Sequence, residues 1–236
     1  GDDARAAALC EESLTVLRDV GYKWGIAHVL DTLGDLARHQ GDYERAAALL
    51  EESLGLFREL KDTGGIASSL YYLGLVALQR RDQERARVLF EESLVLFREL
   101  KDKGGIAWSL HSLGGLARSQ GEHERAAALI EESLAAFREL GQRSAIAVSL
   151  ERLAGAAAAQ GQFARAAALF GAADALRQAI GSRLPPSVRA DSERDVAALR
   201  AKMGEQAFAG AWAAGRAMTL EQAIAHALRK DERDAN

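Results

Sequence analysis

Apolar residues in this chain follow the period of an α-helix, in consecutive pairs of segments. In residues 25–40 they are spaced by three and four, which places on one face Ile26, Ala27, Leu30, Leu33, Gly34 and Ala37. Residues 44–60 repeat this spacing with Ala46, Leu49, Leu50, Ser53, Leu54, Phe57 and Leu60. No segment alternates as a strand would. The pattern predicts two helices, joined by a turn at Gly41, because glycine tolerates the positive φ of a helix end.

This helical pair recurs every 40 residues. The sequence EESLGLFREL begins at Glu51, EESLVLFREL at Glu91, EESLAAFREL at Glu131 and the more divergent EESLTVLRDV at Glu11. One hairpin cannot bury its own apolar face, whereas stacked neighbours can. The predicted fold is therefore all-α: a right-handed α-solenoid of antiparallel helical hairpins with a C-terminal helical cap.

The repeat register predicts the domain boundaries. The solenoid covers residues 1–180, as a half repeat 1–20 followed by units at about 21–60, 61–100, 101–140 and 141–180. Capping helices follow over 181–230, at about 187–203, 205–215 and 220–230, the last of them begun by a capping box of Thr219 and Gln222. The polar tail 231–236 is expected to fray. The cap residues are expected to be Met203, Phe208, Trp212 and Met218, with a separate binding site at Trp212 and Arg216 as the alternative.

One stretch carries a family resemblance. The pattern Leu33-Gly34-x-x-Ala37-x-x-x-Gly41-Asp42-Tyr43-x-x-Ala46-x-x-x-Leu50-x-x-Ser53-Leu54 resembles a tetratricopeptide repeat (TPR). The period of 40 departs from the family's usual length of about 34. Arg58 stands where the family has a proline, so the second helix is expected to run on to Leu60. The resemblance implies a non-catalytic module that binds a protein or peptide partner, or a small effector, in a concave groove.

Positions that differ between the repeats indicate where that groove lies. On the first helix of each unit they lie opposite the face that packs on the second helix, and this is the side that lines the groove in tetratricopeptide arrays. The candidate binding residues are His28, Asp31, Asp35, Tyr71, Tyr72, Trp108 and His111. Aromatic side chains dominate binding hot spots, and Asp31 with Asp35 would favour a basic or hydrogen-bond-donating partner. An ordinary solvated helix face is the alternative.

The C-terminal part resembles a second group of proteins. Residues 169–177, 184–186 and 211–223 are similar to the end of large bacterial LuxR-type and antibiotic-regulator-type (SARP-type) transcription factors and STAND-type signalling ATPases. The same tail also follows kinase and cyclase domains. The resemblance implies the C-terminal regulatory part of a bacterial signalling protein. The chain starts at Gly1 rather than Met, so we expect it to be part of something larger.

Composition narrows the function classes. Among 236 residues, 30 Lys and Arg face 34 Asp and Glu, a net charge of -4 that argues against nucleic-acid contact. The single cysteine, Cys10, cannot form an internal disulfide and fits a cytoplasmic setting. No signal peptide opens the chain, and no apolar run approaches the roughly 20 residues of a membrane span.

The sequence shows no set of catalytic residues. It has no phosphate-binding loop, dinucleotide fingerprint or His-Glu-x-x-His motif. His123 shares a turn position with Tyr43, Gln83 and Phe163, so we expect a half-buried packing role. Cys10 aligns with four apolar residues and is expected in the core. A metal site of His28, Asp31, Asp35 and His111 would lack any recognised spacing. We therefore expect no enzyme, no cofactor and no metal, and the basic clamp of chaperone-binding relatives is absent.

A second hypothesis concerns self-association. Residues 1–20 form the second helix of a hairpin with no first helix before it. The apolar residues Ala7, Leu14, Val16 and Leu17 would then be partly uncovered, and an uncovered apolar face favours pairing with another copy. The sequence therefore allows a homodimer through the N-terminal edge as an alternative to partner binding.

Overall fold

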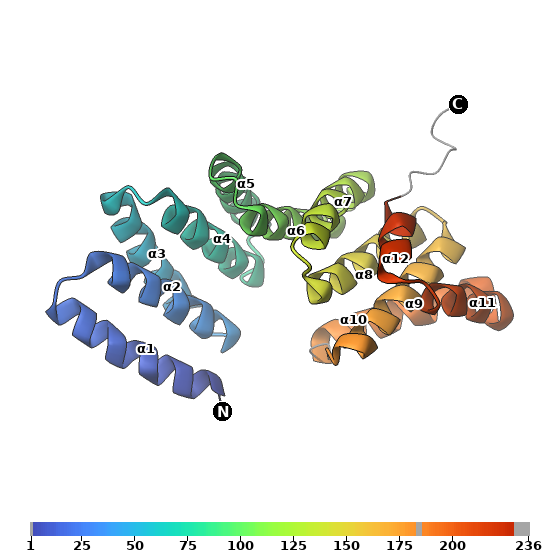
Figure 1. Ribbon diagram of the computed structural model, residues 1–236, viewed down its shortest axis with the longest axis horizontal. Helices are drawn as coiled ribbons and strands as arrows, with labels where there is room; N and C mark the ends of the chain where they lie inside the picture. The colour runs from blue at the N-terminus through green and yellow to red at the C-terminus, as the bar shows by residue number, and fades with distance from the viewer. Residues whose placement is uncertain (1, 183–185, 229–236) are drawn as a thin grey trace. The chain divides into compact units, whose positions relative to one another are not determined.

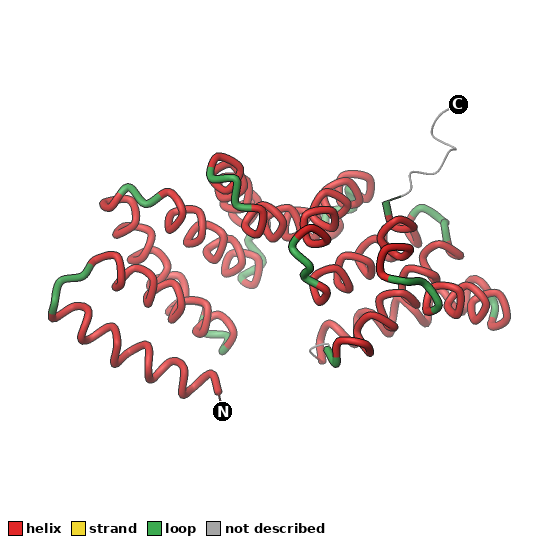
Figure 2. Tube along the Cα trace, viewed as in Figure 1, coloured by secondary structure: helices red, strands yellow, loops and turns green. Residues whose placement is uncertain are grey.

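The computed structural model describes residues 2–182 and 186–228, and these form helices joined by short loops (Figure 1, Figure 2). The helices are α1 Asp2–Asp19, α2 Lys23–His39, α3 Tyr43–Leu60, α4 Thr63–Gln79, α5 Gln83–Glu99, α6 Lys103–Ser119, α7 His123–Glu139, α8 Arg143–Ala159, α9 Phe163–Ile180, α10 Pro186–Met203, α11 Glu205–Arg216 and α12 Leu220–Ala227. No strand occurs in the described ranges. The predicted all-α fold of stacked hairpins is confirmed. The tail 231–236, expected to fray, lies outside the described residues.

The helices fall into two compact units, Gly1–Ser109 and Leu110–Asn236, with the division inside α6. In the first unit each helix from α1 to α4 packs on the next one along the chain. In the second unit α7 packs on α8 and α8 on α9, while α10, α11 and α12 all lie against α9. Each unit is therefore a stack of neighbouring helices whose contacts are mostly local in sequence.

Turns of nearly identical geometry set the helix lengths. A residue with positive φ ends a helix every 20 residues, as glycine at 21, 41, 121, 141, 161 and 181 and as Lys61, Arg81 and Lys101 between them. At the first hairpin the Gly41 N–H donates to the Arg38 carbonyl over 3.1 Å. The Asp42 carboxylate then accepts a hydrogen bond from the Arg45 N–H over 3.1 Å and caps α3. Two adjacent residues thus end one helix and begin the next.

Glycines on the first helix of three hairpins, α2, α4 and α6, let the second helix approach closely. A methyl group on Gly34 would lie 2.6 Å from the Leu50 side chain, one on Gly74 2.6 Å from the Phe90 ring, and one on Gly114 2.5 Å from Ile130. Leu50, Phe90 and Ile130 are themselves buried. Small residues thus mark the points at which the helices cross.

The C-terminal helices cover α9. The backbones of α9 and α11 meet at Gly171 and Gly215, where any side chain would overlap the opposite backbone. Phe208 is buried, and the other expected cap residues, Met203, Trp212 and Met218, are half-buried. The predicted capping box at the start of α12 is confirmed, because the Gln222 N–H donates to Thr219 Oγ1 over 3.2 Å and Gln222 Oε1 accepts from the Thr219 N–H over 2.8 Å.

Adding a methyl group at one helix crossing tests this packing. We expect Gly74→Ala to destabilise the chain by about 1–3 kcal/mol, because the buried Phe90 ring has to move. The control is Gly55→Ala, on an exposed position of α3 where the methyl group meets nothing within 4 Å. It should stabilise by about 0.5–1 kcal/mol through helix propensity. Urea unfolding followed by circular dichroism measures both, and equal effects would contradict the close crossing.

Candidate functional site

The structure divides the candidate binding residues between the two units. His28, Asp31 and Asp35 lie on α2, Tyr71 and Tyr72 on α4, and Trp108 on the first turns of α6, all within the first unit. His111 also lies on α6 but belongs to the second unit. The first unit therefore holds six of the seven candidates, and His111 is described by itself.

Four of the candidates form a cluster between α2 and α4. The Tyr71 and Tyr72 rings lie 5.7 Å apart, and Tyr71 also packs 5.7 Å from the buried Phe90 ring. Burial raises the pKa of Tyr72, and the nearby carboxylates of Asp35 and Asp31 raise it further. Both tyrosines are half-buried. Both tyrosine rings are thus partly exposed to solvent, and Tyr71 also contacts the buried core of the hairpin through Phe90.

Asp31 is not the exposed carboxylate that the sequence predicted. Its exposed fraction is only 6%, and Asp31 Oδ1 accepts a 2.7 Å hydrogen bond from Ser69 Oγ. Burial raises its pKa to about 6, while hydrogen bonds from Ser69 and Ser53 oppose that shift. The cause of its burial is the small serine on α4, which lets the two helices close over the carboxylate. Asp31 therefore acts within the packing of α2 on α4.

Asp35 already has a partner in the chain. Its Oδ1 accepts hydrogen bonds from Arg38 Nε over 2.8 Å and from Arg38 Nη2 over 2.6 Å. Both side chains are half-buried or more, at 26% and 13% exposure. The carboxylate charge is largely neutralised within one turn of α2. A basic partner would have to compete with Arg38, so the acidic surface expected from Asp31 and Asp35 together is absent.

His111 is also buried, contrary to the expectation of a groove-lining side chain. It is 5% exposed, and its ring centroid lies 6.0 Å from that of Phe137 on α7. Burial holds its pKa well below the ordinary value of 6.5, and the charge of Arg152 lowers it further. The equivalent position in the next repeat, Glu151, is likewise enclosed, in an ion pair with Arg177 at 2.6 Å. This position of the first helix faces the packed interior in both hairpins.

Exposed aromatic residues remain at the start of α2 and α6. Trp24 is 46% exposed and Trp108 40%. Trp24 makes an edge-to-face contact with His28, with 4.0 Å between ring centroids, and its Nε1 donates to Asp62 Oδ2 over 2.9 Å. Hydrogen bonds lower the pKa of Asp62, first that from the Gly65 N–H and then that from Trp24. We call Trp24, His28, Tyr71, Tyr72 and Trp108 the aromatic face.

Trp24 was missed in the choice of candidates, although the repeats themselves mark it. The equivalent positions in the later units hold Gly64, Gly104 and Ser144, so only this unit carries a large side chain there. The candidate residues begin further along each first helix, whereas Trp24 lies in the first turn of α2. Comparing residue size along the whole repeat would have found Trp24.

This geometry defines a helical-repeat scaffold, and comparison with known proteins specifies the repeat. Two tetratricopeptide-repeat models match the chain, one over residues 26–60 and another over 65–139. The matched residues comprise α2 with α3 and most of α4 to α7, so the similarity to tetratricopeptide repeats covers this part of the chain.

A solved structure shows the same fold. The crystal structure of BtubC (BKLC) from P. vanneervenii is similar with a TM-score of 0.66 and 25% sequence identity, over 78% of this chain and 77% of that one. No curated protein matches the sequence. The comparisons thus establish the repeat and the fold.

Two further observations concern membranes and metals. None of the helices within 2–182 and 186–228 has the length and apolar character needed to cross a membrane. In the same described part of the chain, no three or more histidine, cysteine, aspartate or glutamate residues are grouped so that they could hold a metal ion.

The buried carboxylate makes stability depend on pH. The pKa of Asp31 is about 6 in the folded chain against an ordinary value of 3.8. Between these values the folded chain keeps a proton that the unfolded chain has lost, so stability falls as pH rises through this window. Asp31→Asn cannot ionise and should remove this fall. The variant should exceed the wild type at about pH 7 by on the order of 2 kcal/mol and match it near pH 4.

Urea unfolding at several pH values between those limits measures the difference. If the two chains keep a constant difference in stability across the range, then Asp31 does not titrate as its burial requires.

Proposed function

We propose that the chain is a non-catalytic protein-interaction module that binds a peptide or protein partner on its aromatic face. The exposure of Trp24 and Trp108 carries this proposal, because six of the seven phenylalanines are buried (Phe57, Phe90, Phe97, Phe137, Phe170 and Phe208). Large exposed aromatic side chains gain free energy when a partner covers them, and they are frequent hot spots. Tetratricopeptide repeats generally mediate protein–protein interaction, which supports the same conclusion.

The aromatic face is partly ordered before any partner arrives. The hydrogen bond to Asp62 and the edge-to-face contact with His28 restrict the Trp24 ring. His28 in turn packs on the buried Phe57 ring, with 4.9 Å between centroids. A side chain held in place loses less rotamer freedom on binding, so more of the contact energy contributes to affinity. The partner best suited to this face would present apolar or aromatic groups rather than a run of basic residues, because Asp31 is buried and Asp35 is paired.

We further propose that this module is the C-terminal regulatory part of a larger bacterial, cytoplasmic signalling or transcription regulator. The support is the resemblance of residues 169–177, 184–186 and 211–223 to the ends of such proteins. A partner or small effector that binds one state of the parent more tightly would shift its switch toward that state. The coding sequence upstream of Gly1 tests this: a phosphate loop or a DNA-binding domain supports the proposal, and a metabolic enzyme domain contradicts it.

Removing the two tryptophans tests the binding face. Peptides would be selected on the wild-type chain from a random display library, and their affinities measured by fluorescence polarisation. We expect Trp24→Ala combined with Trp108→Ala to weaken the selected peptides at least tenfold, as expected for loss of hot-spot residues. Val95→Ala removes another exposed apolar side chain, on α5, and should leave affinity unchanged. Peptides that bind both variants as tightly as the wild type would refute the assignment of this face.

An apolar stripe formed by Leu9 and Val16 of α1 and by Val20 directly after it supports self-association as a second candidate function. These residues are 59%, 58% and 69% exposed. The corresponding residues of α3, Leu49 and Leu56, pack against the cluster of Leu14, Ile26, Leu30 and Leu33 from the preceding helices. On α1 the same stripe has no such cover among the described residues, so a second copy would gain by burying it.

Charge on the stripe tests self-association. If it joins two copies, the wild-type chain should sediment as a dimer at high concentration, and Leu9→Glu with Val16→Glu should be a monomer. Val95→Glu, on an exposed position of α5, should remain a dimer like the wild type. Analytical ultracentrifugation over a wide concentration range measures all three. A wild-type chain that stays monomeric throughout excludes this second function.

A further inference from the structure

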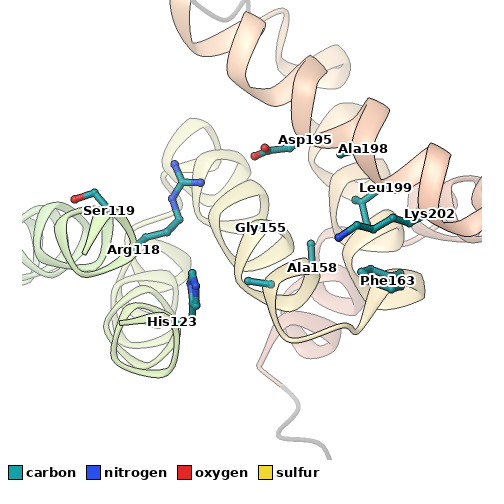
Figure 3. Close-up of a pocket in the computed structure, with 11 residues that line it drawn as sticks. Arg118, Ser119, His123, Gly155, Ala158, Phe163, Asp195, Ala198, Leu199 and Lys202 are labelled. Atoms are coloured by element: carbon teal, nitrogen blue, oxygen red, sulfur yellow. The ribbon is translucent and has the colours of Figure 1, made fainter. Parts of the chain in front are cut away.

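The second unit contains a cavity of about 400 Å³ that the repeat pattern alone did not lead us to expect. We call it the cap cavity, because α10 of the cap forms one of its walls (Figure 3). Its lining comes from five helices, α6 to α10, and consists of Arg118, Ser119, His123, Gly155, Ala158, Ala159, Phe163, Asp195, Ala198, Leu199 and Lys202. A volume of this size lies within the range of small-molecule sites.

The cavity is hollow because α8 has lost its large side chains there. Its wall on this helix consists of Gly155, Ala158 and Ala159. At the equivalent positions of two earlier repeats, larger residues stand: Leu75, Leu78 and Gln79 on α4, and Asp35, Arg38 and His39 on α2. On α6 the equivalent residues are Gly115, Arg118 and Ser119, so only Arg118 is large there. Leu199 of α10 is 2% exposed, so the cap packs beside this wall without filling the space. The small residues of α8 therefore leave a volume open beside this helix.

Basic side chains border the cap cavity from separate helices. Arg118 extends from α6 over α8, where its Nη1 lies 3.7 Å from the position of a methyl group on Gly155. Lys202 extends from α10, with its Nζ 5.1 Å from the centroid of the Phe163 ring. Figure 3 shows both heads at the cavity, with His123 below them. His123 is exposed here, so the half-buried packing role expected from its repeat position is wrong.

The balance of charge around the cap cavity favours an anion. The lining contains two cationic side chains, Arg118 and Lys202, and one carboxylate, Asp195. The imidazole of His123 also lies in the lining. Within the described residues neither Arg118 nor Lys202 takes part in an ion pair, in contrast to other arginines of the second unit, such as Arg177 with Glu151.

We propose that the cap cavity binds a small organic anion, a molecule with one carboxylate or phosphate group on an apolar body. The acidic group lies between Arg118 and Lys202, where charge-assisted hydrogen bonds hold it. The apolar body packs against Ala158, Phe163 and Leu199. This site uses none of the residues of the aromatic face and stands independently of the proposed protein interaction. Because such a ligand touches both α8 and α10, it also stabilises the docked position of the cap.

Calorimetric titration of the full 236-residue chain with matched probes tests the proposal. Hexanoate and benzoate carry a carboxylate, hexyl phosphate carries a phosphate, and hexanol offers the same chain with no charge. We expect at least one anion to bind and hexanol to bind at least tenfold more weakly. The stronger of hexanoate and hexyl phosphate identifies the acidic group. If no anion binds at about 10 mM, or if hexanol binds equally well, the proposal is overturned.

Variants of the lining locate the site. Arg118→Gln and Lys202→Gln should each weaken the anion at least tenfold, because each removes a charged contact. Ala158→Leu restores the residue type of Leu78 and should abolish binding by filling the space. Arg143→Gln is the control, an exposed arginine in the first turn of α8, more than three helical turns from Gly155.

The results have clear readings. Loss of binding in Arg143→Gln, or full binding in both Arg118→Gln and Lys202→Gln, overturns the proposed site. Circular dichroism shows whether Ala158→Leu remains folded. If it does not, the affinities of Arg118→Gln and Lys202→Gln decide whether the anion binds in the cap cavity. The Trp24→Ala and Trp108→Ala variant should still bind the anion, so failure of the protein-interaction proposal is distinguishable from failure of this one.

Discussion

Three of the hairpins depend on a contact between a glycine of the first helix and a large apolar side chain of the second. Gly34 with Leu50, Gly74 with Phe90 and Gly114 with Ile130 let the two backbones approach until the larger residue is buried. This contact fixes where the helices cross, and the turns every 20 residues fix how long they are. Together the two constraints give every unit nearly the same frame. Differences between units then fall on positions that the frame leaves free.

The frame was predictable because it rests on local rules. Helical spacing, positive-φ turns and the Thr219 capping box each depend on residues close in sequence, and the helix bounds follow them within a few residues. The surroundings of Asp31 and His111 were not predictable in this way. Asp31 is enclosed because Ser69, 38 residues later, is small and donates a hydrogen bond. A position that varies between repeats can therefore be buried as well as exposed, and variation alone does not identify a binding residue.

Residue size proved more informative than residue chemistry. Trp24 stands where later units have glycine or serine, and it provides the most exposed tryptophan ring of the first unit. Gly155, Ala158 and Ala159 show the opposite change relative to α2 and α4, from large to small, and a cavity lies beside them. Both departures are visible in the sequence once the repeats are aligned by their 40-residue period. The sequence predicts where α10, the cap helix beside the cavity, begins and ends. Its packing against α8 and α9 depends instead on contacts between segments that are distant in sequence.

The buried polar groups indicate that this scaffold is not optimised for stability alone. A carboxylate at the position of Asp31 costs free energy at neutral pH, because burial opposes its charge. In the second unit, two hydrogen bonds of 2.9 and 2.6 Å from Arg177 to Glu151 offset the free energy lost when these charges are buried. Tyr71 occupies the equivalent position between them in sequence and needs no ionic partner. Since an uncharged aromatic residue is compatible with the fold at this position, the carboxylates of Asp31 and Glu151 are features of their particular hairpins. They make each helix pair distinguishable from its neighbours, which a chain of near-identical repeats requires if each hairpin is to stack in its own place.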